Sequence, residues 1–387
     1  MIESSGNRKN VVVLGAGMIG SAMAQDLAAR EQLQVHVADS RRENLDRVVE
    51  KAPVHAHHVD LGDPVVLKKL LKGCDLAIGA LPSVIGLQTV KASIESGCNI
   101  VDISFMSEDA RVLDPLARER GVVAVTDAGV APGLSNMMAM VAAAWFDTCQ
   151  RLEIAVGGLP AIRRWPFDYK AGFAPWDVLE EYTRPARVVE DGRVVIKEAL
   201  SGLKLIDVPE VGTIESFITD GLRSLTDTLK VPFMEERTLR WPGHAALMKI
   251  FRETGFFSLD PLNVNGQTLR PRDVTAALLF PKWTFAEGEA DITVMQVRAW
   301  GKKNGKAGEF TFDFLDRYDA ATGLRSMSRS TGFTACAIAN LILDGTLSQP
   351  GVHAPEALGA KAGALDAVLD YLRARGIRCH VTQQLQD

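Results

Sequence analysis

The stretch Asn10 to Asp39, NVVVLGAGMIGSAMAQDLAAREQLQVHVAD, decides the fold. Residues 11–14 form a short apolar run that predicts a strand, and the glycine-rich turn GAGMIG follows at residues 15–20. The apolar residues after this turn have helical spacing, and a second apolar run ends at Asp39. Strand, glycine turn, helix, strand and acid in this order are the fingerprint of a dinucleotide-binding βαβ unit.

Each glycine of the turn has its own physical role. Gly15 permits the tight turn out of the strand, Gly17 lets the backbone approach a pyrophosphate, and Gly20 lets the helix pack closely on the strand. The free N–H groups and the positive dipole end at the helix start favour a diphosphate. The alternative is a chance glycine turn in an ordinary βαβ unit. The residues predicted to bind the dinucleotide here are Gly15, Gly17, Met18, Ile19, Gly20, Asp39 and Ser40.

Asp39 also indicates which dinucleotide binds. It lies nineteen residues after Gly20, close to the spacing expected for the acid that accepts hydrogen bonds from the adenosine ribose. A carboxylate at this point suits a free 2′-hydroxyl and repels a 2′-phosphate, whereas the adjacent Arg41 and Arg42 suit a phosphate. We predict NAD as the cofactor in preference to NADP.

The composition is that of a globular protein. The chain has 387 residues, 47% of them hydrophobic and 24% charged, which suits two domains. Its formal net charge of −5 offers no basic surplus for nucleic acid or a membrane surface, so we expect neither as a partner. No segment approaches the roughly 18 apolar residues that cross a bilayer, and residues 1–9 lack the apolar core of a signal peptide. The five cysteines are scattered without a CxxC pair, which argues against a metal site and fits a cytoplasmic location.

Strands and helices continue to alternate after Asp39. Strands are predicted at residues 54–60, 75–81, 99–104 and 122–127, and helices at 64–72, 84–96 and 108–120. Six strands with intervening helices predict an α/β fold with a doubly wound, parallel Rossmann sheet.

Ligands on such sheets lie at the carboxyl ends of the strands. We expect Asp60 to hold the adenine amino group, unless it caps the following helix. Asp102 and Asp127 end the fifth and sixth strands and are candidates for the substrate site, with helix capping as the alternative for each. The residues predicted to contact the cofactor at these strand ends are Asp60, Ala80, Leu81, Pro82 and Ile103.

The pattern changes after an apolar helix predicted at 132–146. Two hairpins, around Asp191-Gly192 and Asn304-Gly305, indicate antiparallel strands. They predict a second α/β domain with a mixed or antiparallel sheet, whose exposed face or edge suits subunit pairing. An apolar helix at 331–343 is expected to return to the first domain. We therefore predict a discontinuous NAD-binding domain at 1–130 and 330–387 and a substrate and dimerisation domain at 131–329.

Several longer stretches resemble a known family. They are DAGVAPGLSN (127–136), GGLP (157–160), YK (169–170), EYTRPA (181–186) and TLRWPGH (238–244). Together they resemble the saccharopine dehydrogenase superfamily along nearly the whole chain, and within it most nearly the L-lysine 6-dehydrogenases. The loop AIRRWP (161–166) departs from the acidic, asparagine-rich loop usual in the saccharopine-forming branch, and that branch favours NADP. Both departures favour a small amino acid as substrate.

The resemblance implies a specific reaction. It implies NAD-dependent oxidative deamination of the ε-amino group of L-lysine to allysine, which cyclises to piperideine-6-carboxylate. It also implies a homodimer or a dimer of dimers. Only a neutral amine has the lone pair that forms the C=N bond, so the ammonium must first lose its proton to a base or to an alkaline medium. We therefore expect an alkaline pH optimum.

Candidate residues follow from these requirements. His244, at a loop-to-helix junction, is the first candidate for the base, with helix capping or packing as the alternative. Glu181 and Asp102 are predicted to hold the ε-ammonium, although Glu181 also fits a solvated helix face. Arg240 is predicted to bind the substrate carboxylate, with a structural ion pair as the alternative. Further residues predicted to line the substrate site are Tyr169, Tyr182, Asp127 and Asn136.

Two rival hypotheses stay open. One is a saccharopine- or carboxynorspermidine-type reductase that joins an amine to a carbonyl with NAD(P)H. It requires several cations for the carboxylates of a larger substrate, and Arg163 and Arg164 keep it open. The other is a non-catalytic, NAD-binding regulator that keeps the fold.

Overall fold

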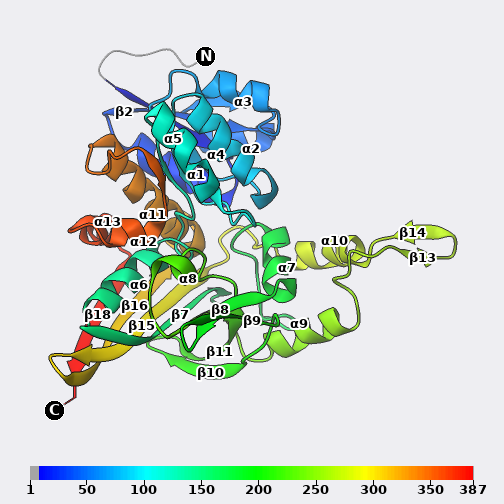
Figure 1. Cartoon of the computed structure of the whole chain (residues 1–387). Coiled ribbons are helices and arrows are strands. Elements are labelled where there is room, and N and C mark those ends of the chain that lie inside the picture. The colour runs from blue at the N-terminus through cyan, green and yellow to red at the C-terminus, as the bar shows by residue number, and fades with distance from the viewer. Residues whose placement is uncertain (1–7, 387) are drawn as a thin grey trace. The chain divides into compact units, whose positions relative to one another are not determined.

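The computed structural model describes residues 8–386 and divides the chain into two compact units. The first unit comprises Met1–Met140 and Ser328–Ile377, and the second comprises Val141–Met327 and Arg378–Asp387. Both units appear in Figure 1, where the first contains the blue and cyan segments. The first unit is therefore discontinuous, as the apolar helix at 331–343 suggested.

The first unit is built on a seven-stranded sheet in which every neighbouring pair is parallel. The strand order is β17-β6-β5-β4-β1-β2-β3, so the order reverses between β1 and β4. The expected doubly wound parallel sheet is confirmed. Its strands are β1 (Lys9–Leu14), β2 (Leu33–Asp39), β3 (His55–His58), β4 (Leu76–Gly79), β5 (Asn99–Asp102), β6 (Val123–Val125) and β17 (Gly351–His353).

Helices connect these strands and cover the sheet (Figure 1). Central strands β1 and β4 read as continuous apolar runs because they are buried on both faces. The Asp63 carboxylate caps α3, and Gly121, with φ of 67°, ends α5 in the left-handed conformation. The helical segments are α1 (Met18–Ala28), α2 (Arg42–Val49), α3 (Pro64–Leu71), η1 (Ser83–Ile85), α4 (Gly86–Glu95), η2 (Ala110–Leu113), α5 (Asp114–Arg120), α6 (Leu134–Ala144), α11 (Ser326–Leu343), α12 (Pro355–Gly359) and α13 (Ala364–Arg373).

The second unit contains a nine-stranded mixed sheet. Its main path is β10-β11-β12-β7-β15-β16-β18, with β8 and β9 attached to β12 as a hairpin. Only β12 and β7 are parallel, and all other pairs are antiparallel. The strands are β7 (Thr148–Pro160), β8 (Ala186–Glu190), β9 (Arg193–Lys197), β10 (Lys204–Val208), β11 (Gly212–Thr219), β12 (Phe233–Arg240), β15 (Asp291–Lys303), β16 (Lys306–Arg317) and β18 (Arg378–Leu385).

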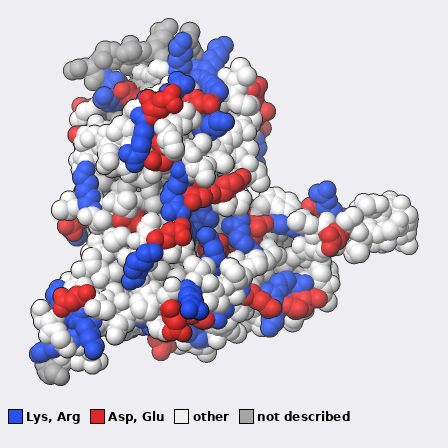
Figure 2. Space-filling model, in the orientation of Figure 1, with Lys and Arg blue, Asp and Glu red and all other residues white. Residues whose placement is uncertain are grey.

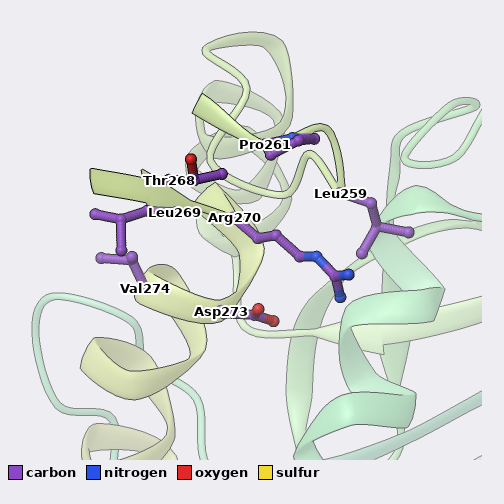
Figure 3. A pocket seen from close by; sticks show the side chains of 7 residues that line it. All are labelled: Leu259, Pro261, Thr268, Leu269, Arg270, Asp273 and Val274. Atoms are coloured by element: carbon purple, nitrogen blue, oxygen red, sulfur yellow. The ribbon is translucent and has the colours of Figure 1, made fainter. Parts of the chain in front are cut away.

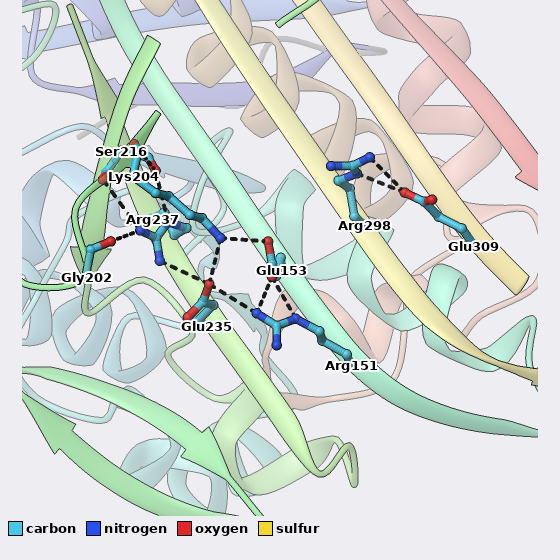
Figure 4. A network of polar contacts seen from close by, with 9 residues as sticks. All are labelled: Arg151, Glu153, Gly202, Lys204, Ser216, Glu235, Arg237, Arg298 and Glu309. Carbon is cyan, nitrogen blue, oxygen red and sulfur yellow. Dashed lines mark hydrogen bonds and ion pairs between the residues drawn. The ribbon is translucent and has the colours of Figure 1, made fainter. Parts of the chain in front are cut away.

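Strand β12 has side chains of different character on its two faces because successive residues alternate. Glu235 and Arg237 belong to a charged network, drawn in Figure 4, that also contains Lys204 and Glu153. Lys204 Nζ lies 3.2 Å from the Glu153 carboxylate and 3.3 Å from that of Glu235. The even-numbered residues of β12 therefore point to the opposite face.

An aromatic core packs on that opposite side. It contains Tyr182, Phe217, Phe257 and Trp283, and Trp283 is fully buried. Phe217 lies on β11, Tyr182 and Trp283 lie on helices, and Phe257 lies in a turn. The helices of the second unit are α7 (Pro175–Thr183), α8 (Leu225–Thr228), α9 (His244–Glu253) and α10 (Pro271–Trp283). A separate two-stranded hairpin, β13 (Leu262–Val264) with β14 (Gln267–Leu269), precedes α10.

The C-terminal segment differs from its expected assignment to the first domain. The prediction placed residues 330–387 there, but the chain leaves the first unit after Ile377. Strand β18 then pairs antiparallel with β16 in the sheet of the second unit. Before this point the chain forms two short helices, α12 and α13, and Gly363 adopts φ of 76° between them.

Candidate functional site

The glycine-rich loop between β1 and α1 has the close contacts that its sequence requires. A Cβ atom on Gly15, whose φ is 101°, would lie 2.5 Å from the Ala80 carbonyl oxygen. A Cβ atom on Gly20 would lie 1.9 Å from the Gly15 carbonyl oxygen. At Gly17, by contrast, no atom lies within 4 Å of the added Cβ. Gly15 and Gly20 are thus required by packing, whereas Gly17 faces open space.

The start of α1 is suited to an anion. Gly17 is its N-cap and supplies no side-chain hydrogen bond to the first turn. Met18 is 39% exposed beside it. Uncapped N–H groups at a helix N-terminus carry partial positive charge and bind phosphate oxygens. The residues present therefore fit the diphosphate of a dinucleotide, with Gly15, Gly17 and Gly20 shaping its approach.

Asp39 ends β2 next to this loop. Its Oδ2 accepts a hydrogen bond from the Ala16 N–H at 2.7 Å, and its Oδ1 accepts one from the Arg41 N–H at 2.7 Å. The Asn44 amide also donates to Oδ2 at 3.2 Å. These bonds fix the carboxylate at the loop, and each carboxylate oxygen has more than one lone pair. Asp39 is therefore placed both to order the loop and to accept from a ribose hydroxyl.

The neighbouring strand ends have more varied roles. Ala80 follows β4 and donates its N–H to the Leu14 carbonyl at 2.8 Å, which holds it against the glycine loop. Leu81 and Ile103 are half-buried, and Pro82 and Ser40 are exposed. Asp60 is exposed, and its Oδ1 accepts from the Gly62 N–H at 2.9 Å within its own turn. Asp63, and not Asp60, caps α3, so the adenine role of Asp60 stays a prediction.

Asp102 is a fully buried carboxyl at the end of β5. Its Oδ1 accepts from the Ser104 N–H at 2.8 Å, and its Oδ2 has no hydrogen-bond partner among residues 8–386. Burial raises the pKa of Asp102 to about 7, and the neighbouring Asp127 carboxylate adds to the increase. Gly79 leaves the space that Oδ2 occupies, since a Cβ there would lie 1.9 Å away. Asp102 is thus a carboxyl that can exchange a proton near neutral pH.

Asp127 precedes α6, and Asn136 lies in the first turn of that helix. Asp127 adopts φ of 54°, and the Ala128 N–H beside it donates to the Asp102 carbonyl at 2.9 Å. Asn136 is fully buried, and its Oδ1 accepts from the Gly133 N–H at 3.1 Å and from the Ser135 hydroxyl at 3.0 Å. Asn136 therefore holds the loop before α6, and its predicted contact with substrate stays a prediction.

In the second unit, Arg240 and Glu181 form a buried ion pair. The Arg240 guanidinium is 2% exposed, bonds the Glu181 carboxylate and donates to the Leu239 carbonyl at 2.9 Å. It also lies 4.5 Å from the centre of the Tyr169 ring. Burial raises the pKa of the Glu181 carboxyl, while Arg240 acts in the opposite direction. The structural ion pair that we considered for Arg240 is therefore present, and its role as substrate carboxylate anchor stays a prediction.

His244 begins α9 and completes a hydrogen-bonded chain. Its Nδ1 lies 2.9 Å from the Phe167 carbonyl, which only accepts, so Nδ1 carries the proton. Its Nε2 then accepts from the Tyr182 hydroxyl at 2.8 Å, and the Tyr182 oxygen accepts from Arg240 Nε at 3.4 Å. Burial, together with Arg240, lowers the pKa of His244 to about 3. His244 is thus a neutral imidazole whose lone pair is engaged by Tyr182, so direct base catalysis requires Tyr182 to move.

Tyr169 and Tyr182 connect these hydrogen-bonded residues to the aromatic core. The Tyr169 and Tyr182 rings lie 4.9 Å and 5.6 Å from the His244 ring. Both also contact Trp283 edge-on, at 5.3 Å and 6.3 Å. The second unit therefore brings together five predicted residues, which we call the polar cluster: Tyr169, Glu181, Tyr182, Arg240 and His244.

Glu236 is a buried acid that the sequence reasoning missed. It lies on the same face of β12 as Arg240, is 4% exposed, and accepts from the Thr219 hydroxyl at 2.5 Å. Burial raises the pKa of Glu236 to about 8, so it holds a proton at neutral pH. The period-two spacing of Glu236, Thr238 and Arg240 was the available signal, but it is visible only once β12 is recognised as a strand.

A small cavity opens beside the polar cluster. It has a volume of about 160 Å³, and its lining includes Tyr169, Trp165 and the cations Arg164, Lys170 and Lys282. Lys170 is engaged with Glu289 at 3.2 Å, and Arg164 lies 4.0 Å from the same carboxylate. Lys282 forms no ion pair among the residues that the structure describes. The cavity can therefore accept an anionic group of small size.

Two further surveys cover the described part of the chain. Within residues 8–386, no helix combines the length and apolar character needed to span a membrane. Within the same residues, no group of three or more His, Cys, Asp or Glu side chains is arranged to hold a metal ion.

The fold and the glycine loop together define the class of the protein: an oxidoreductase with a nicotinamide-dinucleotide-binding domain. The chain belongs to the saccharopine dehydrogenase family. The family model described as the saccharopine dehydrogenase C-terminal domain matches residues 129–377, and the one described as the saccharopine dehydrogenase NADP binding domain matches residues 11–125. The resemblance drawn from the sequence motifs is confirmed at the level of the superfamily.

Individual relatives agree with this assignment. The chain is 27% identical over 202 residues to mouse mitochondrial alpha-aminoadipic semialdehyde synthase. The matched region covers 50% of this chain but only 22% of that protein. It is 22% identical over 426 residues to the NADP+, L-glutamate-forming saccharopine dehydrogenase of Saccharomyces cerevisiae, covering 90% of this chain and 94% of the relative. The solved apo structure of the L-Glu-forming saccharopine dehydrogenase from that yeast superposes with a TM-score of 0.80 at 20% identity, covering 97% of this chain and all of the other. That structural likeness establishes the fold.

Proposed function

We propose that this protein oxidises the ε-amine of free L-lysine with NAD, giving allysine that cyclises to piperideine-6-carboxylate. The family and the dinucleotide-binding unit support an oxidoreductase acting on an amine or imine. The choice of a small substrate with few carboxylates rests on one observation: the chain's own carboxylates already engage most cations near the polar cluster.

Three ion pairs carry this observation. Arg240 is paired with Glu181, Lys170 with Glu289 at 3.2 Å, and Arg163 with Asp168 at 2.7 Å. Breaking such pairs to bind a substrate with several carboxylates would leave charges uncompensated. Lys282 remains available at the cavity, and the exposed Arg164 lies 4.0 Å from the Glu289 carboxylate, which Lys170 contacts more closely at 3.2 Å. Together they suit a single carboxylate, as free lysine carries.

The polar cluster suggests how the amine is handled. A bound nicotinamide supplies the electron acceptor for the carbon that carries the amine. The substrate must reach this step as a neutral amine, whose proton goes to a carboxylate or to the medium. Asp102, with its pKa near 7, is the group in the first unit best matched to exchange that proton. Neutral His244 orients the Tyr182 hydroxyl and does not itself carry charge.

We further propose NAD over NADP, on the strength of Asp39. Its carboxylate is fixed beside the glycine loop by the Ala16 and Arg41 N–H groups, where a 2′-phosphate would meet negative charge. Arg41 and Arg42 are exposed and follow directly, so the NADP alternative has a physical basis too.

A second candidate is favoured by the relatives. The yeast relative is a saccharopine dehydrogenase that uses NADP+ and forms L-glutamate. A reductase of the saccharopine or carboxynorspermidine type would join an amine to a carbonyl and would use Arg164 and Lys282 for the added carboxylates.

One assay separates the two candidates. Purified protein is given NAD and a panel of amino acids that includes lysine, ornithine and saccharopine, at pH 7 to 10, and NADH is followed by absorbance. The first proposal expects lysine alone to reduce NAD, faster at alkaline pH. Turnover that requires saccharopine, or lysine with a 2-oxo acid and NADPH in the reverse direction, would establish the second candidate. No turnover with any of them would overturn both.

A further inference from the structure

The loop at residues 161–167 carries apolar side chains that the proposed reaction does not use. Trp165 is 91% exposed, the largest exposed fraction of any large apolar side chain in residues 8–386, and Ile162 in the same loop is 66% exposed. Within the same residues the Trp165 indole has no hydrogen-bond or ring partner. A tryptophan can bury roughly 150–250 Å². This ring therefore leaves a large apolar contact surface available to a ligand.

The backbone of this loop is nevertheless anchored. The Asp168 N–H donates to the Arg164 carbonyl at 2.9 Å, which closes the turn around Trp165. The Arg163 guanidinium donates to the Asp168 carboxylate twice, at 2.7 Å and 3.0 Å. An exposed side chain changes rotamer quickly and without backbone movement. The Trp165 ring can therefore swing on a fixed base.

Trp165 also lines the cavity of about 160 Å³ beside the polar cluster. Ile162 and Trp165 form its exposed side, whereas Tyr169, 4% exposed, and the half-buried Phe167 form its inner side. A cavity of about 150 Å³ holds a molecule of the size of benzene, so this one accommodates roughly six carbon atoms. Its walls suit an aliphatic chain of that length.

The remaining lining of the cavity is positively charged. Three cations and no acid line it: Arg164, Lys170 and Lys282. The Glu289 carboxylate lies 3.2 Å from Lys170 and 4.0 Å from Arg164, and Lys282 forms no ion pair among the residues that the structure describes. Positive charge therefore exceeds negative charge at the cavity. Cations beside apolar walls suit a carboxylate with an aliphatic body.

A second hollow in the same unit has a different character. It lies at the base of the β13–β14 hairpin, has a volume of about 500 Å³, and is lined by Arg270 together with Asp273, among others (Figure 3). The end of this hairpin is uncoloured in Figure 2 because residues 261–269 contain no charged side chain. With one charge of each sign it does not select an anion, and it contains no residue of the polar cluster. It therefore supplies a matched control.

We propose that Trp165 is a specificity-determining residue that closes over an aliphatic carboxylate of about six carbons, held at its anionic end by Lys282 and Arg164. The inference rests on the proposed function, since it assigns this cavity to the carboxylate and chain of the substrate. Tyr169 connects the cavity to the polar cluster, because its ring lies 4.5 Å from the Arg240 guanidinium carbon and 4.9 Å from the His244 ring.

Binding without turnover tests the proposal. The full-length protein without NAD is titrated with hexanoate, and with acetate as a short carboxylate, by calorimetry at pH 7. Trp165→Ala should weaken hexanoate binding about tenfold or more, and Trp165→Phe should restore most of it. Lys282→Met should weaken hexanoate binding, whereas Arg270→Met, which removes a cation from the second hollow, should not. Absence of hexanoate binding, or equal affinity in Trp165→Ala and the wild type, would overturn the proposal.

Quenching of tryptophan fluorescence by acrylamide tests the closure itself. Hexanoate should protect one indole from acrylamide in the wild type and none in Trp165→Phe. Hexanoate that binds without changing the quenching would overturn the closure of Trp165. Circular dichroism establishes that each variant is folded, which the exposure of Trp165 favours.

These measurements also separate the two proposals. They need neither cofactor nor lysine oxidation, so protected hexanoate binding in a protein that does not oxidise lysine would refute only the proposed reaction. Lysine oxidation with the same KM in Trp165→Ala and the wild type would refute only the role of Trp165.

Discussion

Gly17 is the N-cap of α1 and Gly20 lies in its first turn, yet the structure predicts opposite consequences for replacing these two glycines with alanine. At Gly20 an added Cβ would lie 1.9 Å from the Gly15 carbonyl oxygen, a backbone atom that cannot rotate away. To reach 3.0 Å, α1 must move from the end of β1 by at least 1.1 Å. At Gly17 the backbone is extended, with φ of −68° and ψ of −165°, and the added Cβ meets no atom within 4 Å.

The magnitudes follow from these contacts. Overpacking of this kind costs about 1–3 kcal/mol, so Gly20→Ala should lower the melting temperature of the first unit by roughly 2–12 °C. Gly17→Ala should change stability by no more than about 0.5 kcal/mol. It should nevertheless weaken NAD binding at least tenfold, about 1.4 kcal/mol, because its Cβ occupies the path of the diphosphate.

The assay combines calorimetric titration with NAD and thermal unfolding of the same samples. Gly97→Ala is unsuitable as a control because Gly97 has φ of 73°. A matched control is Gln32→Ala, an exposed position just before β2 and at the opposite end of that strand from Asp39, which should keep both stability and affinity within twofold of the wild type. Wild-type NAD affinity in Gly17→Ala would refute the placement of the diphosphate. Wild-type stability in Gly20→Ala would refute the close helix packing.

Three further predictions concern charged groups. Glu181→Gln should lower the free energy of unfolding of the second unit by about 3 kcal/mol, because it leaves the Arg240 guanidinium buried without its counter-charge. The double variant Glu181→Leu, Arg240→Met should recover most of that loss, and urea titrations measure both effects. Asp102 holds its proton more tightly when folded, with a pKa of about 7 against an ordinary 3.8, so its favourable contribution is full below pH 3.8 and is lost as pH rises through 7. Asp102→Asn should therefore raise stability at pH 8 by on the order of 2 kcal/mol relative to the wild type and flatten the melting temperature between pH 4 and 7; an unchanged pH profile would contradict the assignment. Asp39→Ser should raise the ratio of kcat/KM for NADP to that for NAD at least tenfold, and an unchanged ratio would show that Asp39 does not select the cofactor.

The first unit was largely predictable because its elements follow local rules. The apolar run at 11–14 and the glycine turn predicted β1 and α1. Gly121 ends α5 at Arg120, where the predicted helix at 108–120 also ends. Strand β17 was missed because it has three residues and lies in a segment without periodicity. It becomes a strand only because the edge of β6 supplies its partner, which no local pattern encodes.

The second unit was less predictable because its order comes from long-range pairing. Strand β18 carries Val381 and Thr382, which favour a strand, but only its pairing with β16 assigns it to the second sheet. The five residues of the polar cluster were each named from motifs, and the structure brings them together, but the hydrogen bonds that connect them were not predictable. That the lone pair of His244 is engaged by Tyr182, and that Arg240 is engaged by Glu181, depends on α7 packing beside β12 and α9.

The oxidation of lysine at its ε-carbon can be tested directly by isotope transfer. Lysine carrying deuterium on the ε-carbon is incubated with the protein and NAD at alkaline pH, and the reduced cofactor is analysed by mass spectrometry. Oxidation at the carbon that bears the ε-amine predicts NADH heavier by one mass unit, formed together with a product that behaves as a cyclic imine. Unlabelled NADH, or no NADH from lysine at any pH, would contradict the proposed function.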